Sequence, residues 1–137
     1  MIKNYRLVQN WYAGLVKSQA TSTPPPNSTS IQGHCMGVVG RAWRGVPAGY
    51  ASAHDCMVAV QKAGKLRSTK PPPLAVGFYI GGQYGHVVTT VSRDRVWTSD
   101  LPNTGRIGLV KRLYVTQRWT GLRWGGWCYP SDIPGWK

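Results

Sequence analysis

The sequence predicts an α+β protein in which N-terminal helices pack on a C-terminal antiparallel β-sheet. Apolar residues recur at helical spacing in the first half of the chain, whereas short apolar or alternating runs separated by turns fill the second half. Helices followed by a run of antiparallel strands are typical of this class. A chain of 137 residues is the size of one domain, so we expect a single domain over residues 1–137.

The first expected helix covers residues 3–18, within an N-terminal segment 1–18. Its apolar residues are three and four apart, which places them near one helical face: Tyr5, Val8, Tyr12, Leu15 and Val16. The next segment, 19–32, is rich in proline, serine and threonine. We expect it to be an exposed connection that is extended or disordered.

Two further helices are expected before the strands. One begins near Cys35 and continues over residues 36–43, and the other covers residues 52–63. In the latter helix we expect Cys56 in the core and His54 on the surface. His54, Asp55 and Cys56 are consecutive helical residues that point in different directions, so they do not form a second catalytic cluster.

Five strands are expected after the proline run at residues 71–73. Gly81 and Gly82 form the first turn between them, and Ser92, Arg93 and Asp94 form the second. If that turn is centred on Arg93, His86 and Asp100 lie opposite one another on neighbouring strands. The expected strands cover residues 74–80, 84–91, 95–100, 105–110 and 113–115.

The protein is strongly basic, with 17 Lys and Arg residues against four acidic residues, all Asp, and a formal net charge of +13. Such a charge implies an anionic partner, which is nucleic acid, an acidic membrane surface or an acidic cell-wall polymer. Three cysteines leave at least one unpaired, which favours a reducing compartment. No stretch has the apolar length needed to cross a bilayer, so membrane insertion is not expected.

Cys35 is the candidate nucleophile. The expected helix begins beside it, and Gly33 allows a tight approach of the backbone. The free N–H groups and partial positive charge of a helix N-terminus stabilise a thiolate and can hold an oxyanion. The alternative is that Cys35 is a small buried core residue.

His86 is the candidate general base, and Asp100 is the candidate residue that orients it. A cysteine activated by a histidine that is held by a carboxylate is the arrangement of thiol hydrolases. The alternative is an ordinary strand histidine. No metal is expected, because the residues that a zinc site would use lack paired-ligand spacing: Cys35, Cys56, His34 and His54.

Three short motifs carry a resemblance to a known family. They are Gly33-His34-Cys35 before a helix, the run Pro-Leu-Ala-Val-Gly-Phe-Tyr at residues 73–79, and Gly-His-Val-Val-Thr-Thr-Val at residues 85–91. These motifs resemble the CHAP-type, papain-like (NlpC-like) cysteine peptidoglycan hydrolases. The run at residues 119–127 resembles the tail of short endolysins from phages of actinobacteria.

The resemblance implies a papain-like fold and a single catalytic domain that needs no cofactor. It implies hydrolysis of an amide bond of peptidoglycan, by an endopeptidase or an N-acetylmuramoyl-L-alanine amidase, during phage lysis or entry. It places the nucleophile at Cys35, the base at His86 and the orienting residue at Asp100. The family usually has Gln before the nucleophile, so its oxyanion role falls here on His34, on Gln32, or on backbone N–H groups alone.

The same interpretation gives the expected partners and location. The partners are bacterial peptidoglycan and anionic wall polymers, which the positive charge would attract. We expect a monomer that is made in the host cytoplasm and reaches the cell wall after release, or that travels with the virion. Among the tryptophans, Trp97 is expected in the core, Trp124 is a candidate for substrate contact, and Trp127 is open between these two roles.

Two alternatives from other classes remain open. One is a basic nucleic-acid-binding module, because arginines and aromatic residues interleave near the C-terminus: Arg112, Tyr114, Arg118, Trp119, Arg123 and Trp124. No recognised nucleic-acid motif accompanies them, so nucleic acid is not the expected partner. The other alternative is a virion structural protein built on a hydrolase-like fold.

Overall fold

The computed structural model describes residues 2–136, which form four α-helices and a five-stranded antiparallel sheet. This confirms the α+β class. The helices are α1 (Tyr5–Lys17), α2 (Cys35–Arg44), α3 (Ala53–Lys62) and α4 (Arg112–Arg118). The strands are β1 (Val76–Ile80), β2 (His86–Thr90), β3 (Arg95–Ser99), β4 (Ile107–Lys111) and β5 (Arg123–Cys128), followed by a short 3-10 helix at Pro130–Asp132.

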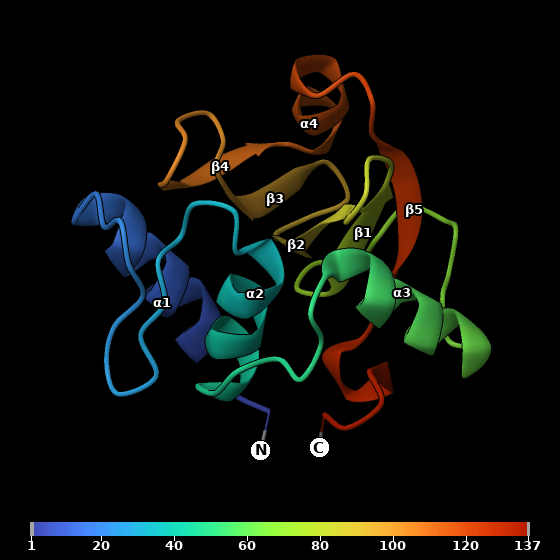
Figure 1. Ribbon diagram of the computed structural model, residues 1–137, viewed down its shortest axis with the longest axis horizontal. Coiled ribbons are helices and arrows are strands. Elements are labelled where there is room, and N and C mark those ends of the chain that lie inside the picture. The colour runs from blue at the N-terminus through green and yellow to red at the C-terminus, as the bar shows by residue number, and fades with distance from the viewer. Residues whose placement is uncertain (1, 137) are drawn as a thin grey trace.

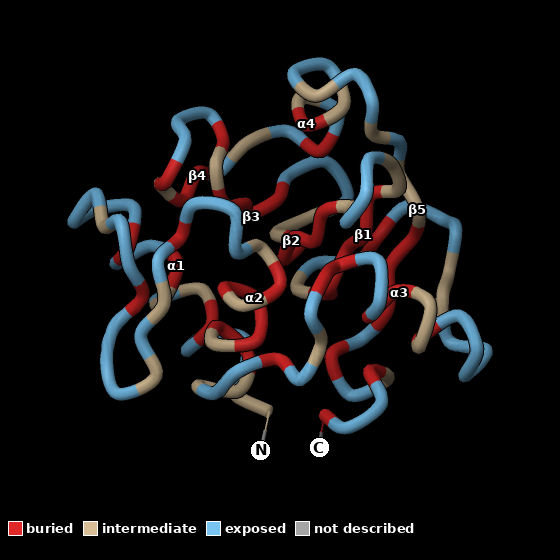
Figure 2. The backbone as a smooth tube through the Cα atoms, in the orientation of Figure 1, coloured by how far each residue is buried: buried red, intermediate tan, exposed pale blue. Residues whose placement is uncertain are grey.

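The sheet separates two hydrophobic clusters. Its strand order is β4-β3-β2-β1-β5, and α1, α2 and α3 lie along one face of it (Figure 1). The larger cluster fills the space between these helices and the sheet, and includes Val8, Val38 and Phe78. A smaller cluster on the opposite face joins α4 to the sheet through Val88 and Val115. The strands are therefore largely buried, whereas exposed segments concentrate in the loops (Figure 2).

Helix α1 forms close to its expected limits. The Asn4 side chain accepts a hydrogen bond from the Leu7 N–H at 3.1 Å and so caps the helix. Of the five apolar residues that the spacing placed near one face, Val8, Tyr12 and Leu15 are buried, whereas Tyr5 and Val16 are 66% and 39% exposed. Among the described residues, no helix is long and apolar enough to span a membrane.

A single buried hydroxyl connects α1 and α2 to β2. Thr89 Oγ1 lies 2.7 Å from the Tyr12 hydroxyl and accepts a hydrogen bond from Trp43 Nε1 at 3.1 Å. The Tyr12 ring also stacks on Trp97, with 5.5 Å between ring centroids, and Trp97 is in the core as expected. Burial raises the pKa of Tyr12, so its hydroxyl stays protonated. These contacts fix the position of both helices along β2.

The proline-bearing connection is more ordered than the sequence indicates. It folds back on itself through backbone hydrogen bonds from Thr23 N–H to Thr29 O and from Ile31 N–H to Thr21 O, at 2.8 and 2.9 Å. Asn27 Nδ2 donates to Gly45 O at 3.0 Å. Because Ile31 is fully buried, the connection delivers the chain to Cys35 along a defined path.

The fifth strand differs from the prediction. Residues 113–115 were expected as a strand, but they belong to α4, where Arg112 and Val115 are buried and Leu113 is 62% exposed. That three-residue spacing is the period of a helix and not of a strand. The fifth strand is instead β5, which pairs with β1 and brings Trp127 opposite Gly77.

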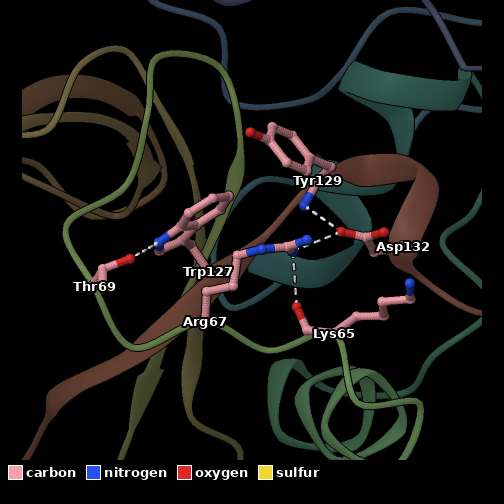
Figure 3. Close-up of polar contacts among 6 residues, drawn as sticks. All are labelled: Lys65, Arg67, Thr69, Trp127, Tyr129 and Asp132. Atoms are coloured by element: carbon pink, nitrogen blue, oxygen red, sulfur yellow. Dashed lines mark hydrogen bonds and ion pairs between the residues drawn. The ribbon is translucent and has the colours of Figure 1, made fainter.

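Arg67 ties the end of β5 to the C-terminal turn. Its backbone exchanges two hydrogen bonds with Trp127, at 2.9 and 2.8 Å. Its guanidinium pairs with Asp132 at 2.9 Å and lies over the rings of Trp127 and Tyr129, 5.1 and 5.2 Å from their centroids (Figure 3). Trp127 is buried, so of the two roles considered for it, core packing and substrate contact, the structure shows packing at this junction.

We predict that Thr89→Val lowers the free energy of unfolding by about 1–3 kcal/mol. Valine keeps the shape of threonine but leaves the buried Tyr12 hydroxyl and Trp43 N–H without their shared partner. Urea unfolding monitored by tryptophan fluorescence measures the change. Thr120→Val, at an exposed turn, serves as the control and is expected to change stability by no more than about 0.5 kcal/mol. Equal stability of the two variants would contradict the role given to Thr89.

Candidate functional site

Cys35 is the first residue of α2, as the sequence predicts. His34 is the N-cap residue, and its carbonyl accepts the first helical hydrogen bond, from the Val38 N–H at 2.9 Å. The N–H groups of the first turn therefore have no partner within the helix. The Cys35 side chain is partly buried and lies at the edge of the larger cluster.

Burial raises the pKa of the Cys35 thiol. The backbone N–H groups of Val87 and Met36 act in the opposite direction, and the nearby Asp100 carboxylate adds to the increase. The helix N-terminus was expected to favour the thiolate, but loss of hydration outweighs it here. In the free protein the thiol is therefore protonated at neutral pH.

His86 is the first residue of β2 and is 5% exposed. Gly85 precedes it with φ +65°, and a Cβ at that position would lie 2.8 Å from the Tyr79 carbonyl oxygen, so only glycine fits. The imidazole meets the Trp119 ring edge to face, with 5.0 Å between centroids. Burial lowers the pKa of His86 to about 4, so the ring is neutral at pH 7.

Thr98 holds the imidazole. His86 Nε2 lies 2.7 Å from Thr98 Oγ1, and that hydroxyl donates its only hydrogen to Ser99 O at 3.0 Å. With its hydrogen directed at Ser99 O, Thr98 Oγ1 accepts from an Nε2–H group. The hydrogen-bond network thus assigns the proton of the neutral ring to Nε2 and leaves Nδ1 with a lone pair.

Asp100 has a different place from the one expected. The pairing of Thr89 with Trp97 confirms the predicted register between β2 and β3. However, Asp100 follows the end of β3 with φ 67°, and its carboxylate accepts hydrogen bonds from the N–H groups of Gly33 and Gly105, at 2.9 and 2.7 Å. The contact with the imidazole is made by Thr98 instead, and Asp100 holds the loop before Cys35.

The two candidate catalytic residues line the same cavity. It has a volume of about 420 Å³, and its lining includes Cys35, His86, Asp100 and Trp119. His86 and Val88 lie on the same side of β2, so the His86 side chain approaches this cavity from the face of the sheet that α4 covers. Cys35 packs against the larger cluster and approaches from the opposite face, which α2 covers. The hydrogen bonds of residues 2–136 do not include a direct one between the thiol and the imidazole.

A larger cavity of about 720 Å³ lies on the other side of Cys35. Gly33, Cys35 and Tyr84 line both cavities, so the thiol sits where the two meet. His34 and Arg41 line the larger one. An extended molecule can therefore pass the thiol with a part in each cavity.

The remaining predicted residues have mixed placements. His34 is exposed at the larger cavity, with Nδ1 3.1 Å from Ser30 Oγ. Gln32 is exposed beside Gly105 and lines neither cavity. Trp124 is not at the cleft, because its ring packs on Tyr79 and under the Arg112 guanidinium, 4.7 Å from the ring centroid.

Sequence reasoning missed three residues of the site: Thr98, Trp119 and Tyr84. Thr98 lies two residues before Asp100 and so points to the same face of β3. Side chains on neighbouring antiparallel strands also contact the residues diagonally opposite, which could have indicated Thr98. Trp119 follows α4 in a turn, and no local pattern points to its contact with His86.

The other cysteines play no part in this cleft. Cys56 and Cys128 are buried, and all three cysteines are free thiols. The prediction of a buried Cys56 and an exposed His54 is confirmed. Within the part of the chain that the structure describes, no group of three or more His, Cys, Asp or Glu side chains is placed to hold a metal ion.

No protein-family model matches this chain, and no curated protein or solved structure is significantly similar to it. The relationship to papain-like hydrolases therefore stays a prediction that rests on short sequence motifs.

We predict that the protein loses stability as the pH falls from about 6.5 towards about 4. Unfolded His86 binds a proton in this window while the folded residue does not, so unfolding takes up a proton and the free energy of unfolding falls by at most about 1.4 kcal/mol per pH unit. Urea unfolding across this range, compared between the wild type and His86→Gln, measures the contribution. The variant should show a shallower pH dependence; identical slopes would contradict the buried neutral imidazole.

Proposed function

We propose that the protein is a cysteine hydrolase that cleaves an amide bond of bacterial peptidoglycan. The observation that carries the proposal is the shared cavity, whose lining includes both a thiol at a helix N-terminus and a neutral histidine whose Nδ1 keeps a lone pair. Thr98 keeps the ring in the tautomer that a general base needs.

In the proposed mechanism, both groups begin in the neutral state. As Cys35 Sγ attacks the amide carbonyl carbon, its proton moves to His86 Nδ1, and the carbonyl oxygen becomes an oxyanion beside the free N–H groups at the start of α2. The imidazolium then protonates the leaving amine, and the C–N bond breaks to give a thioester. Water then attacks the thioester while His86 takes one of its protons; the C–S bond breaks to release the carboxylic acid, and His86 returns the proton to the sulfur, which regenerates the thiol.

The arrangement of the elements supports a papain-like fold as part of this proposal. The nucleophile begins a helix that packs on an antiparallel sheet, and the base begins a strand of that sheet, with the cysteine first in the chain. The chemistry needs no cofactor, because the thiol, the imidazole and the backbone N–H groups supply every group that the steps use.

Peptidoglycan as the substrate is supported by charge and shape. The net charge of +13 favours adhesion to anionic wall polymers, and the open cleft on both sides of Cys35 suits an extended peptide. With the family motifs, this supports a role in phage lysis or entry, with the protein acting as a monomer at the wall or travelling with the virion.

The nucleic-acid alternative has less support. In that hypothesis, arginines and aromatic rings near the C-terminus form an exposed platform for bases. The guanidinium of Arg112, the first residue of α4, packs on the Trp124 ring and donates to Arg93 O at 2.9 Å. Trp119 contacts His86. These side chains are engaged in packing and do not form a free stacking surface.

We predict that the protein clears suspensions of purified actinobacterial peptidoglycan and that Cys35→Ala and His86→Ala both abolish clearing. The first removes the nucleophile and the second removes the base. Loss of turbidity measures the activity, and mass spectrometry of the released fragments identifies the bond. His54→Ala is the matched histidine control, since His54 is exposed on α3, and it should clear normally. Equal clearing by Cys35→Ala would refute the thiol mechanism.

We also predict that Thr98→Val reduces the rate of clearing by about ten- to a hundredfold. Valine preserves the shape but removes the acceptor for His86 Nε2–H, so the ring loses its fixed tautomer. Nitrogen chemical shifts of the His86 ring, measured by NMR in both proteins, report the tautomer directly. A variant that keeps the wild-type ring shifts and the wild-type rate would show that Thr98 does not position the base.

A further inference from the structure

Arg41 occupies an unusual position in the larger cavity beside Cys35. Its side chain is held by two backbone carbonyls, since Nε donates to Asn27 O and Nη1 donates to Gly37 O, the latter at 3.0 Å. A guanidinium has five N–H donors, so these two bonds fix its orientation and leave three donors unused by them. The cation is therefore preorganised on the wall of the cavity.

Within residues 2–136, no carboxylate neutralises this guanidinium. Among residues 2–136, the one ion pair joins Arg67 to Asp132, and no acidic residue lines the larger cavity. Gly37 provides the space for the guanidinium, because a Cβ there would lie 3.1 Å from Arg41 Nη1. A fixed arginine without a counter-ion, at the wall of an open cavity, is suited to bind a carboxylate through paired hydrogen bonds.

The position of Arg41 relative to the nucleophile limits where such a carboxylate lies. Arg41 follows Gly37 by about one helical turn, and its guanidinium reaches back to the Gly37 carbonyl, two residues after Cys35. Both Cys35 and Arg41 line the larger cavity, so a peptide bound there can contact both side chains. Because Cys35 and Gly37 are two residues apart, they point to different sides of α2, and the guanidinium and the thiol are separated by about the width of a helix, roughly 10 Å, which is about three residues of extended peptide.

We propose that Arg41 forms a substrate subsite that binds a carboxylate of the peptide, about three residues from the amide that Cys35 attacks. This inference rests on the proposed hydrolase function and further specifies that the substrate carries a negative charge near the cleaved amide. The carboxylate is either one within the stem peptide, at an isoglutamyl residue, or the one at its C-terminus. Substrates in which this group is a carboxamide are poor, because a neutral amide cannot form the same paired, charge-assisted bonds.

The test compares three synthetic muramoyl peptides with the wild-type protein. One carries both carboxylates, the second has the isoglutamyl carboxylate converted to a carboxamide, and the third has the C-terminal carboxylate converted. We expect one of the two conversions to lower kcat/KM by about ten- to a hundredfold. The sensitive conversion identifies which carboxylate is bound. Equal cleavage of all three peptides would overturn the subsite while leaving the hydrolase function intact.

Variants at Arg41 connect the preference to this side chain. Arg41→Gln should cleave the acid and amide forms at similar, low rates, and Arg41→Lys should keep part of the preference. Arg95→Gln removes an exposed charge on β3 that lines neither cavity, so it controls for net charge and should keep the full preference. A preference that survives in Arg41→Gln would contradict the proposal.

Binding to an inactive protein separates this inference from the proposed chemistry. Calorimetric titration of Cys35→Ala with the same three peptides measures the preference without turnover. Tighter binding of the acid form, lost when Arg41→Gln is added, supports the subsite even if the wild type cleaves none of the peptides. Equal affinity for all three, or no measurable binding, would overturn it.

Discussion

The docking of α2 on β2 is the constraint on which the site depends. Cys35 begins α2 and His86 begins β2, so the relative position of these two elements sets the relation between thiol and imidazole. Thr89, near the far end of β2, bonds to Trp43 near the far end of α2. The two elements are thus fixed at one end by a buried polar contact, while their starting residues meet in the cleft.

Burial shapes the chemistry of the site as strongly as geometry does. It raises the pKa of Cys35 and lowers that of His86, so both effects favour neutral groups and oppose a resting thiolate–imidazolium pair. In the proposed mechanism, charge separation therefore has to coincide with attack on a bound substrate. A resting thiol of this kind reacts slowly with oxidants, because the thiolate is the reactive form.

The sequence predicted the elements better than the contacts at their ends. The helical spacing around Val8 and Tyr12 and the turn at Arg93 are local patterns, and they gave helix α1 and the register of β2 with β3 correctly. Register alone did not predict which side chain meets His86. Asp100 lies beyond the strand in a left-handed conformation and turns to Gly33, a contact between segments far apart in the chain. The segment 113–115 was wrongly predicted as a strand for the same reason, namely a contact between distant segments: Val115 is buried because α4 packs against the sheet.

The single ion pair described above has a wider consequence for a protein of such high charge. Arg67 and Asp132 form the one ion pair among residues 2–136, so the fold is held by apolar packing and hydrogen bonds, while most of the +13 charge remains for external partners. Dissolved salt weakens attraction between exposed charges over distances of about 10 Å but affects packed interiors little. In the proposed adhesion to anionic wall polymers, ionic strength therefore governs how long the protein stays bound, and high salt releases the protein without unfolding it.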